Sequence, residues 1–168
     1  MITKAVGLCL VFITPVIAGY YASNQVRAEC AQLYGLIKLI KHAKRKISGF
    51  MTRQEEIFDD FDDVALERCG FLDCLRNQKL ISEDSLLRTA VVSFENRLSV
   101  SPAAKSALFE FSESFGKLSA EEQSESCDSC AAALNELYDE SRSRADIRAK
   151  LCRTIGFSAG AVAAIMLI

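Results

Sequence analysis

The sequence is poor in the residues that interrupt helices, and it carries little net charge. Its 168 residues include no tryptophan, two prolines, eight glycines and one histidine, with 22 acidic residues against 20 basic ones. So few prolines and glycines leave little material for turns, which favours long helices over many short strands. The net charge of −2 excludes a nucleic-acid binder that relies on overall charge. Half of the residues are apolar, which argues against disorder and suits one ordinary domain.

The apolar residues are concentrated at the two ends of the chain. Residues 5–23 carry no charge, and as a helix they would be roughly 28 Å long, about the thickness of a bilayer's hydrocarbon core. Residues 155–168 are also uncharged, but they would reach only about 21 Å, which is short for a full crossing. The sequence predicts a transmembrane helix over 1–23, a helical-bundle domain over 24–154 and a C-terminal membrane segment over 155–168.

Lysine and arginine lie almost entirely between the two apolar ends. Lys4 alone precedes the first segment, whereas nine basic residues flank the segments on the inner side: Arg27, Lys38, Lys41, Lys44, Arg142, Arg144, Arg148, Lys150 and Arg153. Cytoplasmic flanks of membrane segments accumulate these residues, so we expect a cytoplasmic middle domain with both ends anchored in the cell membrane. The basic flanks also suit anionic lipids. A signal peptide cleaved after Ala18 is the alternative, and it predicts an exported, tail-anchored domain.

Apolar positions in the middle of the chain recur at helical spacing. A first stripe continues from the membrane segment and consists of Val26, Cys30, Leu33, Ile37 and Ile40. The helix that carries it should fray near Ser48 and Gly49. We expect a second helix with one apolar face formed by Ile57, Phe58, Phe61, Val64 and Ala65, and a further helix after Ser82. Two more helices should begin at Ser101 and Ser119. The fold class is therefore all-α, a bundle of about five or six helices whose first and last members continue into the membrane anchors.

Acidic residues gather in one part of the middle domain. Eight acids but only two bases lie between residues 53 and 73, including Asp59, Asp60, Asp62 and Asp63. Their DDxxD spacing is found in prenyl-diphosphate enzymes, where it holds Mg²⁺. This chain has no second acidic motif and is too small for a deep prenyl cavity. We interpret the run as a solvated helix face and predict that its four aspartates bind a basic partner.

No group of residues forms a recognisable catalytic or metal site. Cys127 and Cys130 form a CxxC pair, and with Cys69 and Cys74 a four-thiolate zinc site can be drawn. The glycine, proline and aromatic context of zinc ribbons is missing, however, so we expect reduced, partly buried thiols and no cofactor. The lone His42 lies among basic neighbours that disfavour its protonation. We therefore predict a protein that is not an enzyme.

Small residues in the terminal segments are spaced for close packing of membrane helices. Gly156 and Gly160 form a GxxxG motif that Ala159 extends, and Gly19 belongs to a similar strip in the first segment. Ser158 lies within a GxSxG pattern, but a nucleophile elbow requires a preceding strand. We expect these small residues to serve helix packing in the membrane.

The two ends and the last helix resemble the stage III sporulation protein AB family. The resemblance is carried by Phe111, Gly116 and Gln123, by the long helix leading into residues 155–160, and by Lys4, Gly7 and Gly19 near the amino terminus. The sequence departs from the family pattern at three places. Ser112 stands where the family usually has glycine, Ser119 where it has an acid, and residues 53–54 where a Pro–Leu pair is common.

The resemblance implies a sporulation channel component without an enzymatic activity. Family members are anchored in the mother-cell membrane around the forespore, with a cytoplasmic helical domain similar to the inner-membrane platforms of type II secretion and type IV pilus machines. Such platforms contact a secretion-type ATPase and other membrane subunits. We expect this chain to be a platform or adaptor with those partners and with membrane lipids, and self-association is left open. A cysteine-rich metal-binding protein and an exported tail-anchored domain are the alternatives.

Overall fold

The chain is predominantly helical in the ranges that its computed structural model describes. These are residues 2–50, 54–77 and 86–167 for the backbone, and 24–49, 56–77, 87–147 and 151 for the side chains. They contain seven helices and no strand: α1 (Ile2–Phe50), α2 (Gln54–Ile57), α3 (Val64–Arg68), α4 (Phe71–Asn77), α5 (Leu86–Phe94), α6 (Pro102–Ser114) and α7 (Ala120–Leu167). The predicted all-helical class is confirmed. One helix, α2, is only a single turn.

The chain divides into two compact units. One, which we call the body, consists of residues 28–140, and the other, the terminal unit, of residues 1–27 and 141–168. Both α1 and α7 are unbroken helices of 49 and 48 residues, as the sequence predicts. Among the residues whose side chains are described, no helix is long and apolar enough to cross a membrane. The predicted membrane segments, 1–23 and 155–168, fall outside those residues, so this finding does not bear on them.

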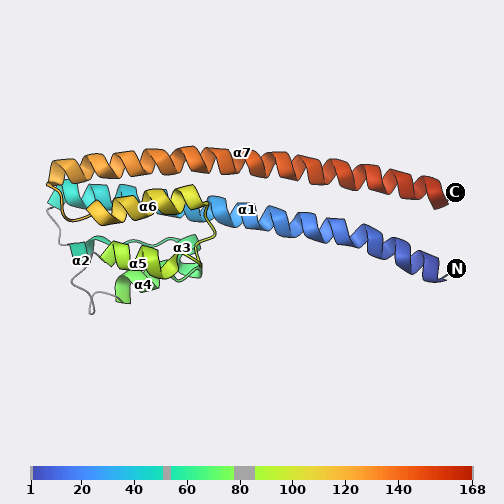
Figure 1. The fold of residues 1–168 in the computed structure, drawn as a ribbon, viewed down its shortest axis with the longest axis horizontal. Helices are drawn as coiled ribbons and strands as arrows, with labels where there is room; N and C mark the ends of the chain where they lie inside the picture. The colour runs from blue at the N-terminus through green and yellow to red at the C-terminus, as the bar shows by residue number, and fades with distance from the viewer. Residues whose placement is uncertain (1, 51–53, 78–85, 168) are drawn as a thin grey trace. The chain divides into compact units, whose positions relative to one another are not determined.

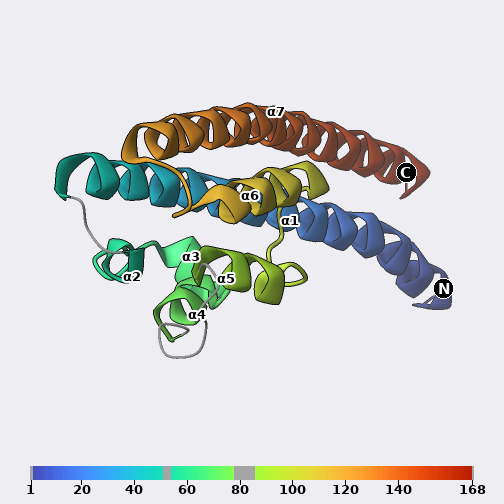
Figure 2. The same cartoon turned by 60° about the vertical axis from the view of Figure 1, so that its left-hand side comes forward.

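In the body, α1 is the central helix. Residues 120–140 of α7 lie along one side of α1, and α6 packs beside both helices (Figures 1 and 2). The helices α2 to α5 cover the side of α1 that faces away from α7. Between Gln32 and Ile47 most side chains of α1 are buried. A narrow strip remains exposed, at spacings of three and four residues: Ala31, Tyr34, Lys38, Lys41, Arg45 and Ser48. A helix that is apolar on nearly all sides belongs in the middle of a bundle.

The interior of the body is formed by aliphatic and aromatic side chains from every helix. Its fully buried members include Leu33, Leu36, Leu66, Phe71, Leu108 and Leu134. Phe58 and Phe111 both contact the ring of Phe115, with centroids 5.7 and 5.3 Å apart, and this joins α2 to the end of α6. On α7 the buried residues follow a heptad-like spacing at Gln123, Cys127, Cys130 and Leu134.

Side-chain caps mark the starts of α6 and α7. The Ser101 hydroxyl accepts a hydrogen bond from the Ala104 amide, Pro102 is the first residue of α6, and Gly116 adopts a positive φ of 82° after its end. Ser119 and Glu122 form the predicted capping box of α7, because the Glu122 carboxylate accepts from the Ser119 amide at 3.0 Å. The predicted starts of these helices are confirmed.

One predicted helix is wrong. The sequence pattern suggests a continuous helix through Ile57 and Ala65, but α2 ends at Ile57 and α3 begins only at Val64. The acidic run therefore lies on a turn and an extended segment, not on a helix face. Aspartate is a poor helix former because its side chain competes for backbone amides, and four of the five residues 59–63 are aspartates. As a result, Val64 is 64 % exposed instead of lying on an apolar face.

Candidate interaction surface

Gly35 allows the start of α3 to lie directly against α1. A Cβ atom at this position would be 2.7 Å from the Asp63 Oδ1 atom and 2.9 Å from the Leu66 Cγ atom, closer than such atoms approach each other. Glycine inside a helix costs about 0.5–1 kcal/mol relative to alanine, so its use here reflects the close approach of the two elements. Sequence reasoning missed Gly35, since the pattern of α1 does not reveal which element packs on it.

Asp63 holds this junction together. Its backbone is extended (φ −150°, ψ 124°), and its Oδ1 atom accepts hydrogen bonds from the amides of Ala65 and Leu66 at 3.0 and 3.4 Å. This makes Asp63 the N-cap of α3. Its Oδ2 atom accepts a hydrogen bond from Lys38 Nζ at 3.1 Å, and the side chain is only 8 % exposed. The sequence predicts that Asp63 is solvated and faces a partner. In the structure its carboxylate is engaged within the body.

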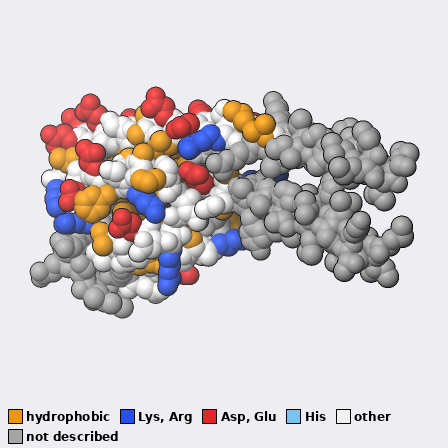
Figure 3. Space-filling model, turned by 45° about the vertical axis from the view of Figure 1, so that its right-hand side comes forward, with side chains coloured by type: hydrophobic (Ala, Val, Ile, Leu, Met, Phe, Trp, Pro, Cys, Tyr) orange, Lys and Arg blue, Asp and Glu red, His pale blue; other side chains and the backbone are white. Residues whose placement is uncertain are grey.

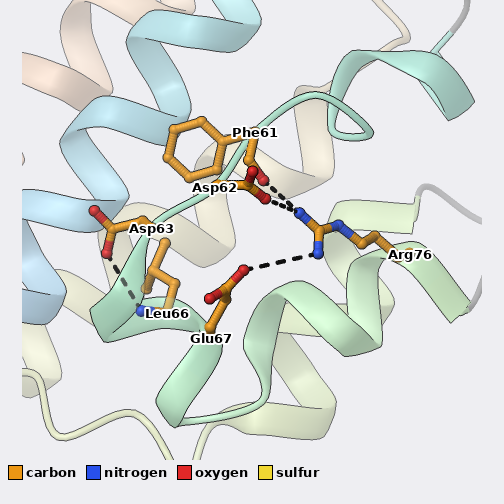
Figure 4. A network of polar contacts seen from close by, with 6 residues as sticks. All are labelled: Phe61, Asp62, Asp63, Leu66, Glu67 and Arg76. Atoms are coloured by element: carbon orange, nitrogen blue, oxygen red, sulfur yellow. Dashed lines mark hydrogen bonds and ion pairs between the residues drawn. The ribbon is translucent and has the colours of Figure 1, made fainter.

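Arg76 of α4 organises the segment around Asp63. Its guanidinium donates a hydrogen bond to the Phe61 carbonyl at 2.7 Å and forms an ion pair with Asp62, while a second nitrogen lies 3.9 Å from a Glu67 oxygen (Figure 4). One arginine thus fixes the backbone of the acidic segment and neutralises part of its charge. The charge-assisted bond to Asp62 adds directional support.

The other three predicted aspartates face solvent. Asp60 and Asp62 have side chains 69 % and 79 % exposed, and Asp59 is also exposed. Asp60 accepts a hydrogen bond from Lys46 Nζ at 2.6 Å, and this bond, more than the lysine charge itself, lowers the pKa of Asp60. We call Asp59, Asp60 and Asp62 the acidic loop. Partner binding by these residues stays a prediction.

A shallow hollow lies beside the acidic loop. It has a volume of about 370 Å³ and is lined by Tyr34 and Lys38 of α1 and by Asp62, Val64 and Glu67 on and before α3. We call it the Tyr34 hollow. Tyr34 is 50 % exposed, although Lys38 Nζ lies 4.4 Å from its ring centroid and the Tyr138 ring of α7 is 5.9 Å away. Large exposed side chains held by neighbours are typical of protein interfaces.

Acidic side chains also line the solvent side of α7 in the body. Residues 120–141 contain seven acids and no lysine or arginine: Glu121, Glu122, Glu125, Asp128, Glu136, Asp139 and Glu140. All seven are exposed, and acidic side chains gather along the edge that α7 forms (Figure 3). Sequence reasoning concentrated on residues 53–73 and missed this stretch, although its one-sided charge is visible in the sequence.

The cysteines whose side chains the structure describes do not form a metal site. Cys127 and Cys130 face the interior with exposed fractions of 1 % and 7 %, and burial raises the pKa of Cys127 to about 11 and that of Cys130 to about 12. Metal binding and nucleophilic attack both require the thiolate, which such surroundings disfavour. Among the described side chains, no three His, Cys, Asp or Glu groups are placed to hold one ion. The four-cysteine zinc site considered from the sequence is therefore not formed.

His42 lies half-buried against the ring of Phe61, with centroids 5.4 Å apart. Burial lowers the pKa of its imidazole below the ordinary value of 6.5, and the charges of Arg45 and Lys46 lower it further, against the raising effects of the Ile57 backbone and Asp60. The sequence predicted the direction from neighbouring charges, but burial is the larger cause. The sequence predicts that Gly19, Gly156, Ala159 and Gly160 pack membrane helices. These four residues lie outside those whose side chains the structure describes.

One comparison with known proteins identifies relatives of the chain. The family model of stage III sporulation protein AB matches residues 4–168, essentially the whole sequence. No curated protein and no solved structure matches it. The match covers the ends and the C-terminal third, where the sequence resemblance was noted, and also the less typical middle region.

Proposed function

Because the chain belongs to the stage III sporulation protein AB family, we propose that it is a non-enzymatic adaptor of the channel complex between mother cell and forespore. In this proposal both ends anchor it in the mother-cell membrane. Its helical body lies in the cytoplasm and couples a secretion-type ATPase to the membrane subunits of the channel. A role in endospore formation follows from the family alone. The coupling role is our extension of it.

The observation that carries this proposal is the separation of charge along the chain. The body contains 21 acidic and 13 basic residues, a net charge of −8, whereas the terminal unit contains one acid and seven bases, a net charge of +6. A basic terminal unit suits anionic lipid at a cytoplasmic leaflet, and an acidic body suits basic protein partners. This is the charge arrangement expected of an adaptor that has one side for membrane and another for protein.

The acidic loop is the part of the body that we propose contacts the ATPase. Arg76 and Asp63 contact the backbone on either side of Asp62 (Figure 4). Because Asp59, Asp60 and Asp62 are all exposed on this segment, they present charge on a defined backbone. A preordered segment loses less conformational entropy when it binds than a flexible one does. Asp63 is left out of this proposed contact because its carboxylate is engaged with Lys38.

The test replaces Asp59, Asp60 and Asp62 by Asn in the full-length chain. Tagged protein is purified from sporulating cells in mild detergent, and the recovered secretion-type ATPase is quantified. We expect recovery to fall roughly tenfold, as expected when several charged contacts of an interface are lost. The matched control replaces Glu95, Glu110 and Glu113 by Gln, since these acids are exposed elsewhere on the body. Equal recovery with both variants contradicts the acidic-loop contact, and no ATPase with the unaltered chain contradicts the coupling role.

Membrane orientation is tested separately by protease protection. Inverted vesicles expose the cytoplasmic face, so added protease should digest the body there but not in intact spheroplasts. Digestion in spheroplasts, together with an amino terminus shortened near Ala18, would instead establish the exported, tail-anchored alternative.

A further inference from the structure

Two exposed apolar side chains distinguish the Tyr34 hollow from the rest of the acidic surface. Tyr34 is 50 % exposed and Val64 is 64 % exposed, and they stand on different helices at the rim of one concavity. Neither side chain stabilises the body much at these exposures. An aromatic residue beside an aliphatic one in a concave site is the usual arrangement for an interface anchor.

The ring of Tyr34 has two neighbours within the body. Lys38 lies over one part of it and Tyr138 packs near it, and Lys38 is itself fixed by its bond to Asp63. A side chain held in this way gives up little rotamer freedom when a partner binds, so more of its contact energy is available for affinity. The arrangement also places Tyr34 between α3 and the acidic stretch of α7.

The charges around the hollow favour a basic occupant. Lys38 is paired with Asp63, and Arg76 already contacts both Asp62 and Glu67. These two bases therefore face three acids, Asp62, Asp63 and Glu67. Tyr138, on the other side of Tyr34, belongs to residues 120–141 of α7, which carry seven acids and no base. The body as a whole has a net charge of −8. The lining of the hollow itself holds three acids, Asp62, Asp63 and Glu67, against the single base Lys38, so an acidic segment would be repelled there.

A second groove in the body lacks this preference. It lies between α5 and α6, has a volume of about 480 Å³, and exposes Val92 and Phe109. Glu95 and Lys105 both line it, so its charge selects neither sign of partner. This groove serves as an internal control for exposed apolar surface without a surrounding acidic field.

We propose that the Tyr34 hollow docks a cationic amphipathic segment of a partner protein, with an apolar side chain against Tyr34 and Val64 and lysine or arginine beside Asp62 and Glu67. The proposal rests on the adaptor function above and names a surface and a partner chemistry for it. It uses a surface centred on α1 and α3, which shares only Asp62 with the acidic loop.

The test uses the full-length chain in sporulating cells, with photoreactive benzoylphenylalanine replacing Val64. A matched strain carries the same group in place of Val92, which is 54 % exposed in the other groove. After irradiation, the cross-linked segment is identified by mass spectrometry. We expect position 64 to capture a segment with at least two lysines or arginines next to apolar residues.

Variants at the rim separate specific docking from chance proximity. Tyr34→Ala should reduce the adduct formed at position 64 by roughly tenfold, the size expected for an interface anchor. Tyr34→Phe keeps the ring and should retain the adduct, and Glu67→Gln should reduce it by less than Tyr34→Ala does. Adducts formed at position 92 should be unchanged by all three variants, which also shows that the variants still fold.

Four outcomes would overturn the docking proposal. These are no adduct at position 64, an adduct with a second copy of this chain, capture of an acidic or uncharged segment, and a yield that Tyr34→Ala leaves unchanged. If the ATPase still co-purifies in any of these cases, the adaptor function stands and only the docking surface fails. If the unaltered chain recovers no partner in either experiment, both proposals fail.

Discussion

The body and the terminal unit differ in charge far more than the whole chain suggests. Residues 28–140 have a net charge of −8 and the remaining residues +6, which together give the small overall value of −2. An anionic membrane surface attracts the terminal unit and repels the body. A small net charge can therefore result from two regions of opposite charge, each suited to a different kind of partner.

The acidic surface of the body rests on a packed interior. Each of the seven helices contributes at least one buried side chain to this interior. Variants within the body should therefore change its stability while leaving the charge of the terminal unit untouched. The following predictions use this separation, and each compares two neighbouring positions.

The largest effect is expected for Leu66→Ala. Leu66 is fully buried where α3 packs on α1, so its truncation should lower the free energy of unfolding by about 2–5 kcal/mol. Val64→Ala, two residues away and 64 % exposed, should change it by less than about 0.5 kcal/mol. Chemical denaturation followed by circular dichroism measures both. Equal losses would mean that α3 does not pack on α1 as described.

Asp63→Ala should have the next largest effect. It removes the N-cap of α3 and the partner of Lys38, and we expect a loss of about 1–2 kcal/mol. Asp62→Ala removes a carboxylate that is 79 % exposed, so its effect should stay within about 0.5 kcal/mol. A result in which Asp62 matters more than Asp63 would reverse the assignment of structural and surface roles within the acidic run.

Glycine substitutions in α1 test the close approach of α3. Gly35→Ala should destabilise the body by about 1 kcal/mol, because the clash with Asp63 and Leu66 outweighs the gain in helix propensity. Gly49→Ala meets no atom within 4 Å, and because Gly49 lies in the last turn of α1 it should stabilise the helix by less than about 0.5 kcal/mol. Opposite signs in thermal unfolding would confirm the difference, whereas stabilisation by both would remove the proposed contact at Gly35.

The smallest effect concerns pH. The folded protein holds the pKa of His42 below 6.5, so the unfolded chain binds a proton more readily in that range. Stability should therefore be unaffected by this group above pH 7 and should decrease as the pH falls below 6.5. The expected loss by pH 5 is less than about 1 kcal/mol, since the imidazole is only partly buried. His42→Gln should flatten this part of the stability profile, and an unchanged slope would show that other groups cause it.

Much of the fold could be predicted from local sequence. Ser101 with Pro102, and Ser119 with Glu122, mark helix starts by chemistry that acts within four residues, and both starts are confirmed. Ser48 and Gly49 likewise predicted the end of α1, which the structure places at Phe50. Such features are predictable because the residues that determine them are near one another in the chain.

The candidate surface was less predictable. The acidic run was recognised, but its backbone was assigned to a helix and Asp63 to the solvent. The role of Asp63 depends on Lys38, which lies 25 residues earlier, and on space that Gly35 provides. The Tyr34 hollow similarly combines α1 with residues beside α3. Periodicity cannot reveal such pairs because it describes only one helix at a time.

By itself, the sequence determined the helical class, the two long helices, the family and the opposite charges of body and ends, because composition, spacing and local capping are written along the chain. Only the tertiary structure decided which acids face solvent, which cysteines are buried, and that the exposed Tyr34 lies beside acidic side chains. Burial and pairing are properties of residues brought together from distant positions, and these contacts exist only once the helices have packed.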